Sequence, residues 1–110
     1  MNKPSTEEII RRQIADNPVI IYMKGTPEAP ECGFSAKAIA ALKSTEADLA
    51  FVNVLQAPFI RERLPSISGW PTFPQLFIKG ELIGGSDIVC EMSASGELQP
   101  LLQDAMTASA

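Results

Sequence analysis

The spacing of apolar residues along this chain changes several times, and the changes predict its secondary structure in order. Ser5 and Glu8 have the spacing of a capping box and begin a helix that ends before Pro18. The apolar run at residues 19–23 (VIIYM) follows, and because both of its faces are apolar it is expected to be a central strand. Apolar residues then recur at helical spacing, which predicts a second helix from residue 33 to about residue 44.

The second half of the chain predicts a strand, a short helix and a β-hairpin. Residues 49–55 (LAFVNVL) are expected to form the strand. Pro58 then stands at the first position of a helix that is expected to end near Pro65. Two short strands at residues 75–78 and 81–83 flank a Lys-Gly pair, which is a signal for a two-residue hairpin turn.

Two helices are expected to complete the chain. Ser86 or Asp87 would cap the first of them, and Gly96 would end it. The second should run from residue 97 to about residue 105 and leave a loose tail from Thr107.

This order of elements predicts an α/β fold with a four-stranded mixed sheet flanked by helices. The first two strands and the helix between them make a right-handed parallel βαβ unit, and the last two strands make an antiparallel hairpin. Residues 1–110 are expected to form a single domain, because no repeat, linker or low-complexity tract divides them.

Composition excludes several classes of function. The net charge of -4 argues against a general affinity for nucleic acid or for an anionic membrane. The longest apolar run, residues 19–23, is far shorter than the roughly 18 residues of a membrane helix. The N-terminus does not look like a signal or transit peptide, so the cytoplasm is the expected location. With 2 cysteines and 0 histidines, one chain cannot supply the four ligands of a Cys/His zinc site.

Cys32 is the residue with the clearest chemical potential. It lies between the apolar strand and the second helix, where free N–H groups and the helix dipole favour a thiolate. A buried structural thiol is the alternative, and the Pro- and Glu-containing loop before it argues against burial. Ser35 occupies the place of the second thiol in a Cys-x-x-Cys pair, so Cys32 has no partner inside its own motif. Cys90 is expected to be a core residue, and no disulfide with Cys32 is expected in a reducing compartment.

Taken together, these features resemble the glutaredoxins. A Cys-x-x-Ser at a helix start, a Thr-x-Pro loop before a hairpin and a Gly-Gly turn before a helix occur in that order. The tetrad at residues 32–35 (CGFS), the long loop at 24–32 and the segment at 70–76 (WPTFPQL) are similar to the monothiol CGFS subfamily in particular. The likeness spans essentially the whole chain and implies a thioredoxin fold with a glutathione site.

The resemblance also implies the roles of individual residues. Lys24 and Arg61 would pair with the two carboxylates of glutathione, and Asp87 would meet its amino group. Phe73 would offer its backbone N–H and C=O before a cis Pro74, and Ser86 stands where the family commonly has a second cysteine. Two positions are open to a packing role as well: Trp70 in the loop and Phe34 beside the thiol. With Cys32 as the catalytic and metal-binding thiol, the expected glutathione-binding residues are Lys24, Phe34, Arg61, Thr72, Phe73, Pro74, Gly85, Ser86 and Asp87.

The function that the resemblance implies is carriage of an iron–sulfur cluster. A 2Fe-2S cluster usually needs four thiolate ligands, so Cys32 from two chains and the thiols of two glutathiones would complete the set in a bridged homodimer. A BolA-type protein and recipient apo iron–sulfur proteins are the implied partners. One alternative is a weakly active glutathione-dependent thiol-disulfide oxidoreductase that acts on glutathione mixed disulfides. Another is a docking module in which Cys32 is incidental.

Overall fold

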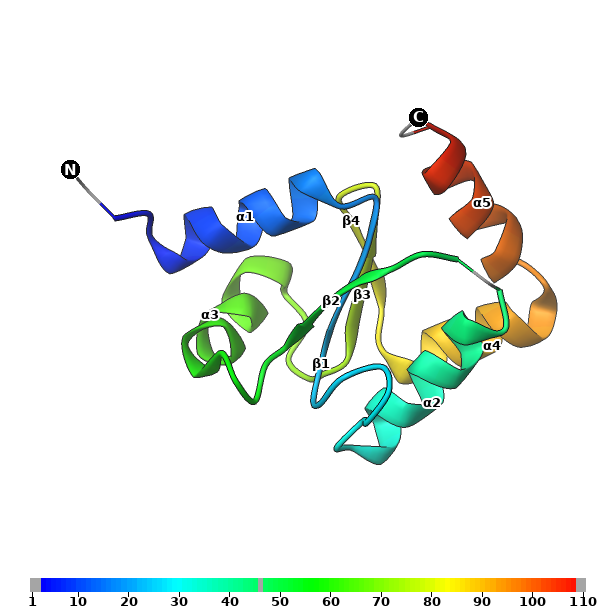
Figure 1. The fold of residues 1–110 in the computed structure, drawn as a ribbon, viewed down its shortest axis with the longest axis horizontal. Helices are drawn as coiled ribbons and strands as arrows, with labels where there is room; N and C mark the ends of the chain where they lie inside the picture. The colour runs from blue at the N-terminus through cyan, green and yellow to red at the C-terminus, as the bar shows by residue number, and fades with distance from the viewer. Residues whose placement is uncertain (1–2, 46, 109–110) are drawn as a thin grey trace.

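One mixed β-sheet organises the molecule, with helices on both of its faces (Figure 1). The structure is a computed structural model that describes residues 3–45 and 47–108. The strands lie in the order β2-β1-β3-β4. The four strands are β1 (Val19–Met23), β2 (Ala50–Asn53), β3 (Gln75–Ile78) and β4 (Glu81–Gly84).

The pairing of the strands agrees with the prediction from sequence. β1 pairs in parallel with β2 and antiparallel with β3, and β3 pairs antiparallel with β4. All five residues of β1 and all four of β3 are buried, as expected for the two central strands of a sheet covered on both faces. The hairpin turn between β3 and β4 places Lys79 at φ 52° and Gly80 at φ 81°, which are the positive values that a two-residue type I′ turn needs.

The helices divide between the two faces of the sheet (Figure 1). α1 (Thr6–Asp16) and α3 (Pro58–Ser68) cover one face. α2 (Gly33–Lys43), α4 (Ser86–Ser95) and α5 (Leu98–Ala108) cover the other face.

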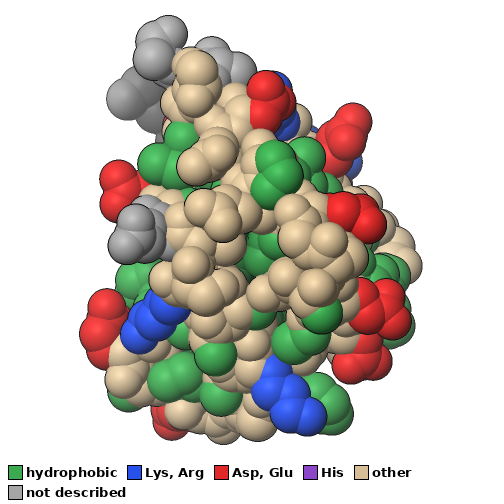
Figure 2. Space-filling view, turned by 90° about the vertical axis from the view of Figure 1, so that its right-hand side faces the viewer, with side chains coloured by type: hydrophobic (Ala, Val, Ile, Leu, Met, Phe, Trp, Pro, Cys, Tyr) green, Lys and Arg blue, Asp and Glu red, His purple; other side chains and the backbone are tan. Residues whose placement is uncertain are grey.

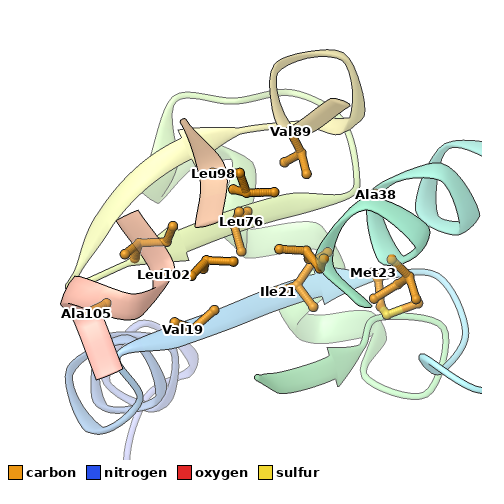
Figure 3. Close-up of a cluster of buried hydrophobic side chains, with 12 residues drawn as sticks. Val19, Ile21, Met23, Ala38, Leu76, Val89, Leu98, Leu102 and Ala105 are labelled. Atoms are coloured by element: carbon orange, nitrogen blue, oxygen red, sulfur yellow. The ribbon is translucent and has the colours of Figure 1, made fainter. Parts of the chain in front are cut away.

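Alternate residues of β1 supply the two hydrophobic cores. Ile20 and Tyr22 face α1 and α3. Val19, Ile21 and Met23 face the other three helices, as Figure 3 shows. The remaining buried residues of that larger core come from β3 and the three helices: Ala38, Ile39, Leu42, Leu76, Ile78, Val89, Leu98, Leu102 and Ala105.

Several helix ends differ from the prediction, and α3 is the clearest case. The helix does not end near Pro65; it continues to Ser68, and Gly69 ends it in the left-handed conformation at φ 73°. Pro65 has no N–H to donate to the carbonyl four residues earlier. Ile60 and Leu64 before the proline are nevertheless buried, and Ile67 after it packs against the same core, so packing holds the helix on both sides of the proline.

The start of α4 and the end of α5 also differ from the prediction. Gly85 is the N-cap residue of α4, so neither Ser86 nor Asp87 caps the helix, and both lie in its first turn. α5 extends to Ala108, which makes Thr107 helical rather than part of a loose tail. Residues 109 and 110 lie outside the described part of the chain.

β2 is shorter than the predicted strand at residues 49–55 because the chain turns after Asn53. The side-chain oxygen of Asn53 accepts hydrogen bonds from the N–H groups of Leu55 at 3.1 Å and of Gly25 at 2.9 Å. The first bond closes the turn that ends β2. The second ties this turn to the loop that follows β1, and thereby fixes the two neighbouring strand ends to each other.

The face formed by α2, α4 and α5 carries no concentrated charge among its described residues (Figure 2). Acidic side chains are spread around its edges, and the few basic side chains lie apart from one another. Among residues 3–45 and 47–108, no helix is long and apolar enough to cross a bilayer.

Candidate functional site

Five segments of the chain meet at one end of the sheet. They are the loop after β1, the start of α2, the middle of α3, and the two turns that precede β3 and α4. Together they enclose a groove of about 530 Å³, a volume within the range of ~300–1,000 Å³ that is usual for small-molecule sites. The groove is lined by Lys24, Cys32, Phe34, Arg61, Pro65, Pro71, Thr72, Phe73, Ser86 and Asp87.

The structure therefore brings eight of the residues predicted from sequence to one groove, which are Lys24, Cys32, Phe34, Arg61, Thr72, Phe73, Ser86 and Asp87. Pro74 and Gly85 do not line it. Both are buried directly behind its wall, and a Cβ atom at Gly85 would lie 3.2 Å from the Pro74 carbonyl oxygen. They support the lining residues instead of facing the groove.

Cys32 is the N-cap residue of α2 and is partly exposed. The backbone N–H of Ser35 is the largest influence that lowers the pKa of this thiol, and burial opposes it. The Phe34 N–H, the positive charge of Lys24 and the Ser35 hydroxyl lower the pKa further. The side chain of Cys32 makes no hydrogen bond that caps the helix. The site can thus hold a thiolate that remains accessible.

The loop between Lys24 and Cys32 is held in a fixed shape by its own backbone. Glu31 donates its N–H to the Lys24 carbonyl at 2.9 Å, and Gly25 forms a β-bridge with Pro30. Gly25 has a φ of 94°, and a Cβ atom there would lie 2.5 Å from the backbone nitrogen of Glu31. The close approach of the two halves of this loop therefore requires glycine at this position.

The loop before β3 forms the opposite wall and is supported from beneath. Gln75 is fully buried, and its side-chain amide donates to the carbonyl oxygens of Trp70 at 2.9 Å and Thr72 at 3.2 Å. The peptide bond between Phe73 and Pro74 is cis, as predicted. These contacts fix the backbone of Thr72 and Phe73 at the edge of the groove.

Trp70 packs against the glycine turn and does not face the groove. Its indole nitrogen would lie 3.1 Å from a Cβ atom at Gly85. The same turn presents Ser86, whose hydroxyl is buried in the groove wall and has no hydrogen-bond partner within the described residues. Phe34, unlike Trp70, lines the groove, and 58% of its surface is exposed beside the thiol.

The charges of the groove have a definite pattern. Lys24 and Arg61 contribute two positive charges from the loop after β1 and from α3. Asp87 contributes one negative charge from the first turn of α4. A ligand that carries two negative groups and one positive group would complement these side chains.

Cys90 is not the core residue that the sequence predicted. It is partly exposed on α4, and its sulfur lies 3.8 Å from the carbonyl oxygen of Lys37 on α2. Both cysteines are free thiols, and Cys90 does not line the groove. In the part of the chain that the structure describes, no three Cys, Asp or Glu side chains gather as a metal site. A single chain therefore offers the groove one thiol.

Sequence reasoning missed three contributions to this site. Pro65 and Pro71 line the groove. Pro65 was missed because α3 was predicted to end there, whereas the helix continues to Ser68. Asn53 anchors the loop after β1 through its side chain. The only sequence signal for Asn53 was a polar residue inside an apolar strand, which does not say what the side chain would bind.

Comparisons with known proteins agree with this geometry. The model of the glutaredoxin family matches residues 19–83. The chain is 54% identical over 100 residues to Glutaredoxin 4 of Escherichia coli (strain K12), covering 91% of this chain and 87% of that protein. It is 56% identical over 89 residues to the probable monothiol glutaredoxin GrlA of Legionella pneumophila, covering 81% of this chain and 100% of that protein. The solution structure of reduced poplar apo GrxS14 superimposes with a TM-score of 0.79 at 41% identity, covering 96% of each chain.

Proposed function

Because this chain belongs to the glutaredoxin family and has its thioredoxin fold, we propose that it binds glutathione in the Cys32 groove and carries a 2Fe-2S cluster. In this proposal the carrier is a homodimer bridged by the cluster. The observation that supports it most directly is a single, partly exposed thiol with a lowered pKa beside a groove of complementary charge.

Glutathione fits the groove by charge and by hydrogen bonding. Its two carboxylates and one ammonium match the two cations, Lys24 and Arg61, and the one anion, Asp87. The Ser86 hydroxyl is buried without a partner among the residues that the structure describes, and an unsatisfied buried polar group costs about 1–3 kcal/mol. A carboxylate seated near the start of α4 would accept from that hydroxyl and from the free N–H groups of the helix. Phe73 would contribute its backbone N–H and C=O.

The number of available thiols supports a dimer. Four thiolates usually hold a 2Fe-2S cluster, and one chain brings only Cys32 to the groove. Two copies of Cys32 and two glutathione thiols would give four. Half of these ligands exchange with solution, so the cluster is held in a form suited to transfer.

The proposal also covers the location of the protein and its partners. We place it in the cytoplasm as a single glutaredoxin domain of residues 1–110. Its partners are a BolA-type protein, in a hetero-complex, and apo iron–sulfur proteins as recipients of the cluster. Nucleic acid and membranes are not expected partners, given the net charge of -4 and the scattered basic residues of the face formed by α2, α4 and α5.

Anaerobic reconstitution tests the carriage of the cluster. Iron, sulfide and a reductant should give visible charge-transfer absorption only when glutathione is also present. Cys32→Ser should abolish that absorption, and Cys90→Ser should leave it unchanged because Cys90 lies outside the groove. Full cluster loading in the absence of glutathione, or in Cys32→Ser, would contradict the proposal.

A second candidate function is favoured by the lowered pKa of Cys32, since a thiolate is also the nucleophile of thiol–disulfide exchange. The thiolate would attack the glutathione sulfur of a mixed disulfide, break its S–S bond and release the substrate thiolate. A second glutathione thiolate would then attack the bound glutathione, release oxidised glutathione and restore Cys32, because Ser35 has no thiol. Fast steady-state turnover of a glutathionylated peptide would favour this function, and near-zero turnover favours cluster carriage.

A further inference from the structure

We propose that Gln75 is a positioning residue for ligand binding, and that its buried side-chain amide determines which backbone groups of the loop before β3 face the groove. The inference rests on the proposed function in taking glutathione as the ligand. It gives a specific task to a polar side chain that lies beneath the groove wall and does not line the groove.

The segment at residues 70–74 (WPTFP) has few backbone N–H groups. Its two prolines have none, although every residue of the segment has a carbonyl oxygen that needs a donor. Gln75, the next residue, supplies donors from its side chain. Its Nε2 donates to the carbonyl oxygens of Trp70 at 2.9 Å and of Thr72 at 3.2 Å. Both protons of the amide are thus used within the loop that precedes it.

The burial of Gln75 is not explained by the stability of the fold. Gln75 is 0% exposed in β3, where the other three residues are apolar. Its Oε1 is buried and has no hydrogen-bond partner among the described residues. Because an unsatisfied buried acceptor opposes folding, an apolar side chain would be the simpler choice at this position. What the glutamine adds is the pair of donors at Nε2.

The two hydrogen bonds leave the backbone of Phe73 open to a ligand. Within residues 3–45 and 47–108, the N–H and C=O of Phe73 have no hydrogen-bond partner. The ring of Phe73 packs against the core under α1 and α3, although the residue also lines the groove. Its free N–H and C=O can therefore pair with an extended peptide as a strand would.

The direction of the neighbouring carbonyl groups is the reason that Gln75 matters for binding. Its amide holds the carbonyl oxygens of Trp70 and Thr72 on the inner side of the loop. Without that amide these oxygens would lose their donors, and the loop could turn them toward the groove. A carbonyl oxygen there would repel a ligand with two carboxylates. Gln75 thus favours glutathione without a contact of its own.

Gln75→Met tests the inference, because methionine has a similar length and volume but no donor. Isothermal titration calorimetry should show that reduced glutathione binds about tenfold more weakly. The midpoint of urea denaturation should stay close to that of the parent, because the variant also loses the unpartnered Oε1. A role in stability alone would move the midpoint and leave the affinity unchanged.

Gln13→Met is the matched control. Gln13 is a partly buried glutamine on α1 that accepts a hydrogen bond from the Tyr22 hydroxyl at 2.8 Å, and it does not line the groove. This variant should bind glutathione as the parent does. A folded Gln75→Met protein with the affinity of the parent, or equal losses of affinity in the two variants, would overturn the inference.

A measurement on the parent protein keeps the inference testable if Gln75→Met does not fold. In an NMR titration with glutathione, the side-chain amide of Gln75 should shift with the same half-saturation concentration as the Phe73 backbone amide. The side-chain amide of Gln103, which is exposed on α5, should not shift. A Gln75 amide that stays fixed while the Phe73 amide saturates would overturn the inference alone. A parent protein that does not bind glutathione would contradict the proposed function and the inference together.

Discussion

Neighbouring residues of the same type have different roles in this protein, and the two arginines of α3 illustrate it. Arg61 lines the groove beside Cys32. Arg63, two residues later, forms an ion pair with Glu7 on α1, and the same carboxylate also pairs with Arg11 at 3.0 Å. The hydrogen bond from Arg11 is the largest influence that lowers the pKa of Glu7. The charge pattern alone could not separate the two arginines, because both occur in one run of charged residues; the resemblance to the glutaredoxins singled out Arg61.

Arg61→Ala should weaken glutathione binding about tenfold, since a hydrogen bond to a charged group typically contributes ~1.5–3 kcal/mol and Arg61 is partly screened by solvent. Isothermal titration calorimetry with reduced glutathione measures the change. Arg63→Ala is the matched control and should bind as the parent protein does, because Arg63 pairs with Glu7 outside the groove. Equal losses in the two variants would show that net charge, and not the position of Arg61, governs binding.

The order and type of the elements could be predicted from the sequence, while their ends often could not. The apolar run at residues 19–23 needs both faces covered, and this requirement fixed β1 as a central strand. The ends of α3 and α5 depend on tertiary packing, which local proline and tail signals do not contain. Cys90 was misplaced for a similar reason: its apolar neighbours suggested burial, but on α4 it is partly exposed, with its sulfur beside the Lys37 carbonyl of α2.

At the scale of the helix, Pro65→Ala should stabilise the fold. Alanine restores the missing N–H in the interior of α3, where proline costs about 3 kcal/mol. The larger entropy of the unfolded chain offsets ~0.4–1 kcal/mol of that gain. Urea denaturation should show a net increase of about 2–2.5 kcal/mol in the free energy of unfolding.

Pro100→Ala is the matched control for this helix prediction. Pro100 is in the first turn of α5, where a backbone N–H has no partner within the helix, so its replacement should give no such gain. A Pro65→Ala protein that is less stable than its parent would mean that the proline ring contributes more through packing against the groove than it loses in hydrogen bonding.

For the whole molecule, the sheet order explains how the site is assembled. β1 and β3 are the central strands, so the segment that leaves β1 and the segment that enters β3 lie side by side. α2 and α4 begin at the same edge of the sheet. The sequence predicted the parallel pair β1 and β2, and functional sites generally gather at the carboxyl ends of such strands. It could not supply Pro65, Pro71 or the anchoring of the loop by Asn53, because these depend on how separate elements meet.

The composition of the loaded protein tests the central claim most directly. Native mass spectrometry of the anaerobically reconstituted protein should detect two chains, one 2Fe-2S cluster and two glutathiones in one species, and Cys32→Ser should remain a monomer without iron. A cluster bound to a single chain, or a cluster-bridged dimer that lacks glutathione, would contradict the account.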